Sequence, residues 1–321
     1  MAWILSVLLL IIAGTLLYLA GELLVSGLLR LSRYFRAQEF VVAFFVMAVA
    51  ATMPNFFVGF TSALQGIPEL SFGDIMGNNM VALTLGVALA VFFSPKKELP
   101  IGNHTVRGTT FLTAIAAFLP LALITDGVLS RFDGVILISF FALYVIWLFS
   151  RKDRFSKVYD EKRALSLKEG RIGAIKAIAK VIVGLILLAV SAQVVVQAAV
   201  MAAEGLQIPL ILIGVLVIGF GGALPELYFT VISARKGETD MLLGNLMGAV
   251  IIPATLVLGM VALIQPIYNE NLELPLIGRI LLATVALFFL YLSRTKQLIS
   301  RNEGALLVLI YFVFIVAMLL L

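Results

Sequence analysis

The sequence predicts an all-α integral membrane protein with ten transmembrane helices in two inverted five-helix repeats. Three observations support this prediction. Of the 321 residues, 62% are hydrophobic and only 13% are charged, whereas about 25% of the residues of a soluble chain are charged. Ten apolar runs approach the roughly 20 residues that cross a bilayer as a helix. Finally, the two halves of the chain share glycine and proline positions at a fixed offset.

The apolar runs are joined by short connections, apart from one long charged linker. They cover residues 3–29, 39–64, 70–94, 108–126, 133–150, 174–202, 208–235, 240–265, 275–294 and 303–321. We therefore expect a first five-helix repeat over 1–150, a cytoplasmic charged linker over 151–173 and a second five-helix repeat over 174–321.

Lysine and arginine residues predict the orientation in the membrane. All of them except Arg131 and Arg279 lie in or beside the connections that follow odd-numbered runs. Positive charge favours the cytoplasmic side, so we expect these connections to be cytoplasmic and both termini to be extracellular. Short loops without appended domains favour a prokaryotic plasma membrane.

The internal repeat is visible without gaps. A shift of 171 residues places Pro54 on Pro225, Gly73 on Gly244 and Thr84 on Thr255. Each copy holds five spans, and an odd number makes the second copy enter the membrane from the opposite face. Inverted repeats of this kind are common in secondary transporters.

One short stretch, 219–226, concentrates unusual residues inside an apolar run. Its three glycines and Pro225 predict an interrupted helix. Glu226 then places a carboxylate at membrane depth, which costs about 3 kcal/mol or more unless it is paired. A weaker counterpart at 50–55 ends in Pro54 and Asn55. A broken helix beside a buried acid is typical of an ion or substrate site near the bilayer midplane.

A second polar segment follows each of these stretches. Asp74 and Asn78 are four residues apart and share one helix face, where they can meet Asn55 and Glu226. Carbonyl oxygens freed at the breaks would complete a set of oxygen ligands, which Ca²⁺ and Na⁺ prefer. The candidate ion-binding residues are Glu226, Asn55, Asp74, Asn78, Asn79, Thr52 and Asn245, with Glu226, Asn55 and Asn78 as candidate metal ligands.

These paired segments resemble the α-repeats of the sodium/calcium exchanger family, within the cation/Ca²⁺ antiporter superfamily. The resemblance covers most of the chain and implies ten spans and transport of cations such as Ca²⁺ or Na⁺. It also implies that Glu226 matches the acidic ligand of the second repeat, Thr52 a hydroxyl position of the first, and Asn79 a conserved family asparagine.

The chain departs from the family pattern at several ligand positions. Asn55 stands where the first repeat usually has its glutamate, so the chain is a divergent member lacking one central acid. Ala82 and Pro253 stand where a further Asn or Asp is frequent. One carboxylate suits a monovalent ion or a proton better than a divalent ion, unless Asp74 points inward and supplies a second charge.

The leading functional hypothesis is a secondary active cation antiporter that works by alternating access, exchanging Ca²⁺ or a monovalent cation for Na⁺ or H⁺. The first and sixth spans would move around a fixed site. Two alternatives remain open: a transport-inactive binding or structural protein of the same fold, and a ten-span exporter of small metabolites.

Composition argues against other classes. The chain has no cysteine and one histidine, His104, which disfavours thiolate and histidine metal sites. No basic stripe predicts nucleic-acid binding, and no motif predicts an enzyme or a bound cofactor. The expected partners are the lipid bilayer and inorganic cations, and the oligomeric state is left open. Glu22, late in the first span, is expected to have an interfacial or structural role.

Overall fold

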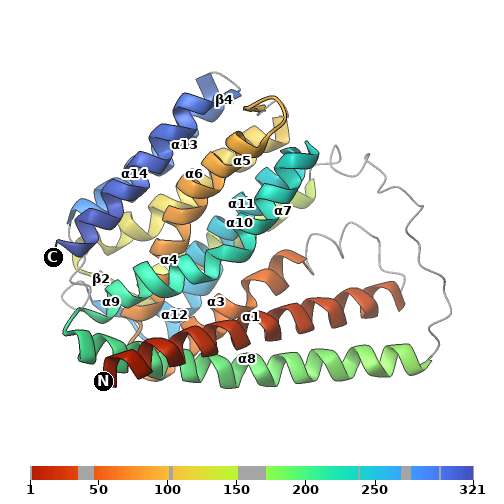
Figure 1. Ribbon diagram of the computed structural model, residues 1–321, viewed down its shortest axis with the longest axis vertical. Coiled ribbons are helices and arrows are strands. Elements are labelled where there is room, and N and C mark those ends of the chain that lie inside the picture. The colour runs from red at the N-terminus through yellow and green to blue at the C-terminus, as the bar shows by residue number, and fades with distance from the viewer. Residues whose placement is uncertain are drawn as a thin grey trace.

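The computed structural model describes residues 2–34, 47–100, 104–150, 171–237, 239–268, 276–295 and 298–320. Within them the fold is helical, as predicted (Figure 1). The first repeat contains α1 (Ala2–Tyr34), α3 (Met47–Leu64), α4 (Glu69–Val81), η2 (Ala82–Gly86), α5 (Val87–Phe93), α6 (His104–Leu123), η3 (Ile124–Asp126) and α7 (Arg131–Ser150). The second contains α8 (Arg171–Leu206), α9 (Leu210–Ile213), η6 (Gly214–Ile218), α10 (Gly219–Lys236), α11 (Thr239–Ile252), η7 (Pro253–Val257), α12 (Leu258–Ile264), α13 (Leu276–Thr295) and α14 (Arg301–Leu319).

These elements form ten helical runs in the described residues, because α4–η2–α5, α6–η3, α9–η6–α10 and α11–η7–α12 are each continuous. Eight runs are long and apolar enough to cross a membrane, and α13 adds the shorter apolar stretch Gly278–Leu292. The remaining run, α3, begins at Met47, since residues 39–46 of the predicted second span lie outside the described residues. The ten-helix prediction is confirmed. Residues 151–170 of the linker also lie outside the described part of the chain.

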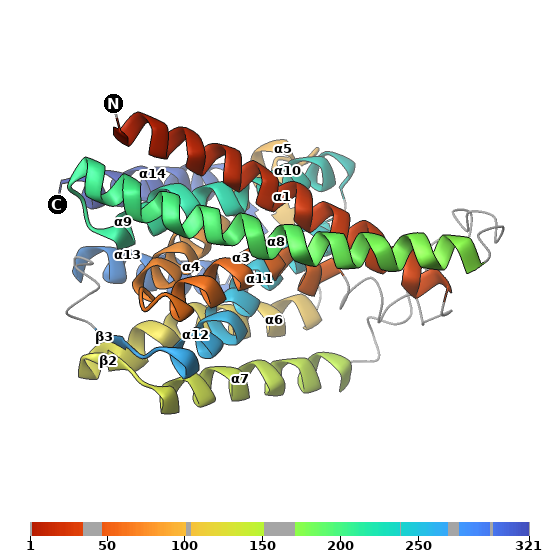
Figure 2. The same cartoon turned by 90° about the horizontal axis from the view of Figure 1, so that it is seen from below.

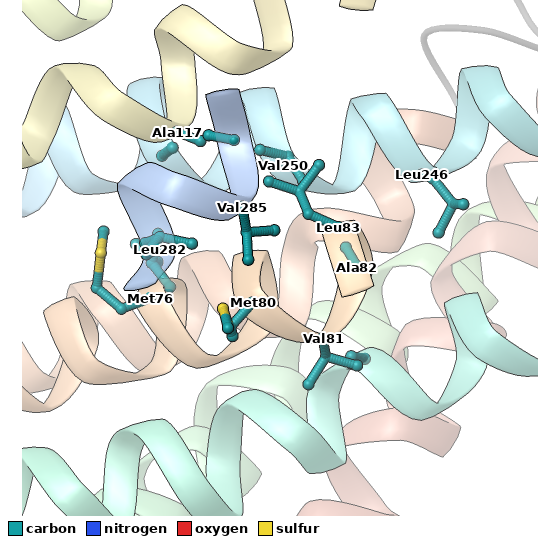
Figure 3. Close-up of a cluster of buried hydrophobic side chains, with 14 of the residues drawn as sticks. Met76, Met80, Val81, Ala82, Leu83, Ala117, Leu246, Val250, Leu282 and Val285 are labelled. Carbon is teal, nitrogen blue, oxygen red and sulfur yellow. The ribbon is translucent and has the colours of Figure 1, made fainter. Parts of the chain in front are cut away.

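The helix α4 lies at the centre of the molecule. Every residue from Leu70 to Val81 is buried. One apolar face packs against α13, as Figure 3 shows for Met76 beside Leu282 and for Val285 near Leu83. This burial places the polar residues of α4 inside the protein and away from lipid.

Another face of α4 meets η6 and α10 through glycines. A Cβ atom added at Gly214 would lie 2.6 Å from the carbonyl oxygen of Leu70, and one at Gly219 would lie 2.6 Å from that of Asp74. Added Cβ atoms at Gly73 and Gly77 would overlap the carbonyl oxygens of Ile211 and Val215. Only glycine permits two helix backbones to approach this closely, so these four glycines bring the two repeats into direct contact.

The long helices α1 and α8 lie side by side along one edge of the molecule, and α7 lies on the far side (Figures 1 and 2). Gly27 of α1 contacts Ala177 and Val181, and Gly184 of α8 contacts Leu24. Their outward faces expose large apolar residues such as Ile11, Ile12, Ile182 and Ile186. A face of this composition suits contact with lipid.

In the described part of the chain, two short antiparallel sheets join the repeats. Strand β1 (Glu98–Pro100) pairs with β4 (Leu298–Ser300), and β2 (Val128–Leu129) pairs with β3 (Ile267–Tyr268). Each sheet therefore takes one strand from each repeat. The helices that follow β2 and β4 begin with the same cap, since Ser130 bonds to Asp133 and Ser300 bonds to Glu303. Capping of this kind fixes where a helix starts.

The expected helix breaks are absent from the described residues. The helix α3 continues through Pro54, and α10 continues through Gly221, Gly222 and Pro225. The irregularity instead takes the form of three π-helical segments, η2, η6 and η7. A π turn absorbs one extra residue without ending the helix, so the backbone stays hydrogen-bonded within the bilayer.

Candidate cation site

The candidate site lies where α3, α4 and α10 cross beside Gly222. A Cβ atom added at Gly222 would lie 3.4 Å from Asn55 Oδ1 and 4.0 Å from Asp74 Oδ1. Two oxygen atoms from two other helices thus approach one point on α10. Because Gly222 has no side chain, these two oxygen atoms have space beside α10. The sequence reasoning had interpreted this glycine only as part of a helix break.

Glu226 stands one helical turn after Gly222, on the same face of α10. Its Oε2 atom is buried and has no hydrogen-bond partner among the described residues. The carboxylates of Asp74 and Glu226 lie close enough to interact electrostatically. Asn55 and Asp74 therefore approach the face of α10 that also carries Glu226, and their joint role as ligands stays a prediction.

Asp74 is the most enclosed of these groups. It is 0% exposed, and neither carboxylate oxygen has a hydrogen-bond partner in the described part of the chain. A buried charge without a partner is very costly, so the carboxyl group requires a cation or a proton. The fully buried Asn79 on the same helix also lacks hydrogen bonds, since neither its amide nitrogen nor its amide oxygen has a partner among the described residues.

Asn78 has a bond that links the repeats. Its Nδ2 donates to the carbonyl oxygen of Ala249 over 2.9 Å, between positions 171 residues apart. That oxygen lacks its helical donor because Pro253, four residues later, has no N–H group. This bond holds the amide group in place, and the amide oxygen is the atom that could bind a cation. The sequence reasoning did not identify Ala249 as the partner, although Pro253 marks a carbonyl oxygen without a helical donor.

The remaining candidates are less closely tied to the crossing. Thr52 is buried on α3 one turn before Asn55. Asn245 is partly buried on α11, where its Nδ2 has no partner among the described residues. Carbonyl oxygens can still serve as ligands, although the helices are not broken. Pro54 and Pro225 lack an N–H group, so the oxygens of Ala50 and Gly221 lose their helical donors.

The part of α1 that carries Glu22 packs against α3. A Cβ atom at Gly21 would lie 3.2 Å from Cγ of Pro54, so this part of α1 is level with the residue that precedes Asn55. Tyr18 donates a 2.6 Å hydrogen bond to Glu22 Oε1. The hydrogen bond from Tyr18 agrees with a structural role for Glu22, and its position relative to the membrane interface stays a prediction.

The chemistry of the crossing is that of a hard-cation site. It offers carboxylate and amide oxygens, which bind Na⁺ or Ca²⁺. Among the described residues, no three His, Cys, Asp or Glu side chains gather into a group that could hold a metal ion. The acids at the crossing are a pair, supplemented by amide and backbone oxygens.

Comparisons with known proteins agree with this architecture. The family model for the sodium/calcium exchanger protein matches residues 5–150 and 176–320. The inner membrane protein YrbG of Escherichia coli is 26% identical over 309 residues, which cover 95% of this chain and 94% of YrbG. The putative antiporter CaxA of Alkalimonas amylolytica is 25% identical, over 92% of this chain and 93% of CaxA.

A solved structure has the same fold. The sodium-calcium exchanger NCX_Mj, soaked with Na⁺ and Sr²⁺, superimposes with a TM-score of 0.63 and 25% identity over 98% of both chains. The sodium/calcium exchanger MaX1 of Methanosarcina acetivorans is 22% identical, over 87% of this chain and 89% of MaX1.

Proposed function

The chain belongs to the sodium/calcium exchanger family and is a multi-pass membrane cation antiporter, and from this premise we propose that its transported cation binds at the crossing of α3, α4 and α10. Glu226 is the principal acidic ligand, and Asn55 and Asp74 supply further oxygens. Thr52, Asn78, Asn79 and Asn245 line or support the same region. The exchanged ions are Ca²⁺ or a monovalent cation on one side of the cycle and Na⁺ or H⁺ on the other.

The observation that carries this proposal is the meeting of Asn55 Oδ1 and Asp74 Oδ1 beside Gly222, one turn from Glu226. Hydrocarbon cannot stabilise charge, so acids at membrane depth mark ion pathways. Ions that compete for one such site cannot occupy it together, and this exclusion couples the movement of one ion to that of the other.

Burial suggests the route by which the cation enters. Asp74 is completely buried, whereas Asn55 and Glu226 are partly exposed. The cation therefore enters past Asn55 and Glu226 and reaches Asp74 last. The long pair α1 and α8, which contacts α3 near Pro54, moves against the other helices and opens the site to each side in turn.

The proposed setting is a prokaryotic plasma membrane with extracellular termini, and residues 1–150 and 174–321 act as the two repeats. Segment 151–173 is a cytoplasmic linker. The ends of α1 and α14 that carry the termini lie at the same end of the molecule in Figure 1, which agrees with an even number of spans. We assign transport to the chain and no enzymatic reaction.

Ion flux into proteoliposomes tests the site. Wild-type protein should take up Ca²⁺ when an outward Na⁺ or H⁺ gradient is imposed, and Glu226→Gln should lose this uptake. Glu204→Gln, at an exposed position of α8, is the matched control and should transport normally. Equal flux in wild type and Glu226→Gln would refute the site assignment.

A further inference from the structure

The repeat offset shows that the polar residues of the crossing occupy matching positions in the two repeats. A shift of 171 residues places Asn55 on Glu226 and Asp74 on Asn245. The first repeat thus has an amide on α3 and an acid on α4. The second repeat has an acid on α10 and an amide on α11. Acid and amide have exchanged positions between the two copies, and each copy retains one carboxylate.

Asp74, the acid of the first repeat, approaches the same point beside Gly222 as Asn55, the amide at the position that matches Glu226. Asp74 Oδ1 and Asn55 Oδ1 are the two side-chain atoms nearest to a Cβ built on Gly222. Asp74 is 0% exposed, and both its oxygens lack a partner among the described residues. A carboxyl group that served only the fold would be expected to accept hydrogen bonds, as Asp133 does from Ser130.

On the basis of the proposed function, we propose that Asp74 replaces the acid absent at position 55, so that two carboxylates on exchanged helices hold one divalent cation. Two negative charges balance a dehydrated divalent ion, whereas Glu226 alone would leave a net positive charge in a medium of low dielectric constant. The same balance requires two monovalent cations or two protons to replace the divalent ion.

Calcium binding to purified protein tests the assignment of Asp74. Isothermal titration with CaCl₂ should show binding to wild type, and Asp74→Asn should weaken it by about 100-fold or more, because one partner of a buried charge pair is removed. Glu69→Gln removes an acid from the first turn of the same helix and should bind Ca²⁺ as wild type does. Equal affinity in wild type and Asp74→Asn would overturn the proposal.

Relocating the charge provides the second variant. In Asn55→Glu/Asp74→Asn, the carboxylate moves from α4 to α3 while the charge of the site is kept, and Ca²⁺ affinity should return to within about tenfold of wild type. If Asp74→Asn does not fold, this double variant decides. Recovered binding supports the proposal, and a folded double variant without binding overturns it.

Thermal unfolding distinguishes whether Asp74 binds Ca²⁺ or only supports the fold. Ca²⁺ should raise the midpoint of wild type and of Glu69→Gln but not that of Asp74→Asn, because a ligand stabilises only the state that binds it. A Ca²⁺-induced rise in Asp74→Asn equal to that of wild type would overturn the proposal.

Failure of this inference differs from failure of the proposed function. If Glu226→Gln abolishes flux and Asp74→Asn binds Ca²⁺ normally, only the role of Asp74 is wrong. If Glu226→Gln leaves flux unchanged, the location of the site itself is wrong.

Discussion

Gly221 and Gly222 are neighbours on α10 but differ in their surroundings. A Cβ atom at Gly221 meets no atom of the described residues within 4 Å, whereas one at Gly222 approaches Asn55 Oδ1 at 3.4 Å. Gly222 therefore provides space for the oxygens of the site, and Gly221 does not. This difference gives a matched pair of substitutions one residue apart.

We expect Gly222→Ala to reduce cation affinity, because the added methyl group occupies space between the helices that carry the ligands. Gly221→Ala should leave transport unchanged, and it should stabilise α10 by about 0.5–1 kcal/mol, the usual difference between Ala and Gly within a helix. Ca²⁺ titration and proteoliposome flux measure both effects. Equal losses from the two substitutions would show that helix flexibility matters instead of space at the site.

The bond between Asn78 and Ala249 makes a second prediction for single residues. Asn78→Ala removes the donor to a carbonyl oxygen that Pro253 has left without a helical partner, and it should destabilise the protein by about 1 kcal/mol. Pro253→Ala restores the backbone donor, so Asn78→Ala should cost less in that background. A double-mutant cycle of unfolding free energies measures the coupling. Strict additivity would contradict the link.

The candidate site residues could be selected from the sequence because membrane insertion is so costly for polar groups. Glu226, Asn55 and Asp74 stood out within apolar runs, and the repeat offset indicated that they meet. The partner of Asn78 was not predicted, because a hydrogen bond from a side chain to a backbone oxygen depends on how two helices cross.

The three π-helical segments show how an element can look broken in sequence and remain continuous. The segments η2 and η7 begin at Ala82 and Pro253, which are related by the repeat offset. Each contains a threonine, Thr84 or Thr255, whose hydroxyl bonds to a carbonyl oxygen four residues earlier. This bond satisfies a group that the wider turn leaves short of a donor.

Glycine and proline therefore identified the correct helices but suggested the wrong distortion. Hydrocarbon penalises an open break more than a π turn, because every backbone polar group must be paired inside the membrane. The η6 segment ends at Ile218, directly before the Gly219–Glu226 stretch. Sequence alone did not show how the irregularity would be distributed along the helix.

The contact between α4 and α10 supplies a prediction about helix packing. Gly219→Ala should destabilise the protein by about 1–3 kcal/mol or more, because the new Cβ would lie 2.6 Å from the carbonyl oxygen of Asp74. Gly14→Ala on α1, where nothing described lies within 4 Å, is the control and should be neutral or slightly stabilising. Thermal unfolding of the two variants measures the difference, and equal stability would argue against this close packing.

For the whole molecule, the two small sheets indicate which parts move together. Each sheet joins a connection of the first repeat to a connection of the second, while α1 and α8 pair with each other along one edge of the molecule (Figure 1). We infer that the sheets hold the helices α4 to α7 and α11 to α14 as one body, against which α1 and α8 move.

Disulfide cross-linking tests this division, and the chain has no native cysteine to interfere. Pro100 and Leu298 are directly paired across β1 and β4, so a disulfide between cysteines at these positions should form readily. The oxidised Pro100→Cys/Leu298→Cys variant should transport at a rate close to that of its reduced form. Arrest on oxidation, with recovery on reduction, would show that the two connections separate during transport.

Repeat symmetry allowed the sequence to predict ten helices in two inverted repeats, since one offset and an odd number of spans define an inverted pair. It could not predict the close α4–α10 contact or the sheets between repeats, because both depend on the assembled halves.

The central claim is that one cation binds between Asn55, Asp74 and Glu226. Its most direct test is an anomalous diffraction map from crystals soaked with Sr²⁺, an electron-rich substitute for Ca²⁺. We predict a peak at the crossing of α3, α4 and α10, in contact with the carboxylate oxygens of both Asp74 and Glu226. A map with its peak elsewhere, or a fully occupied peak that touches neither carboxylate, would contradict the account.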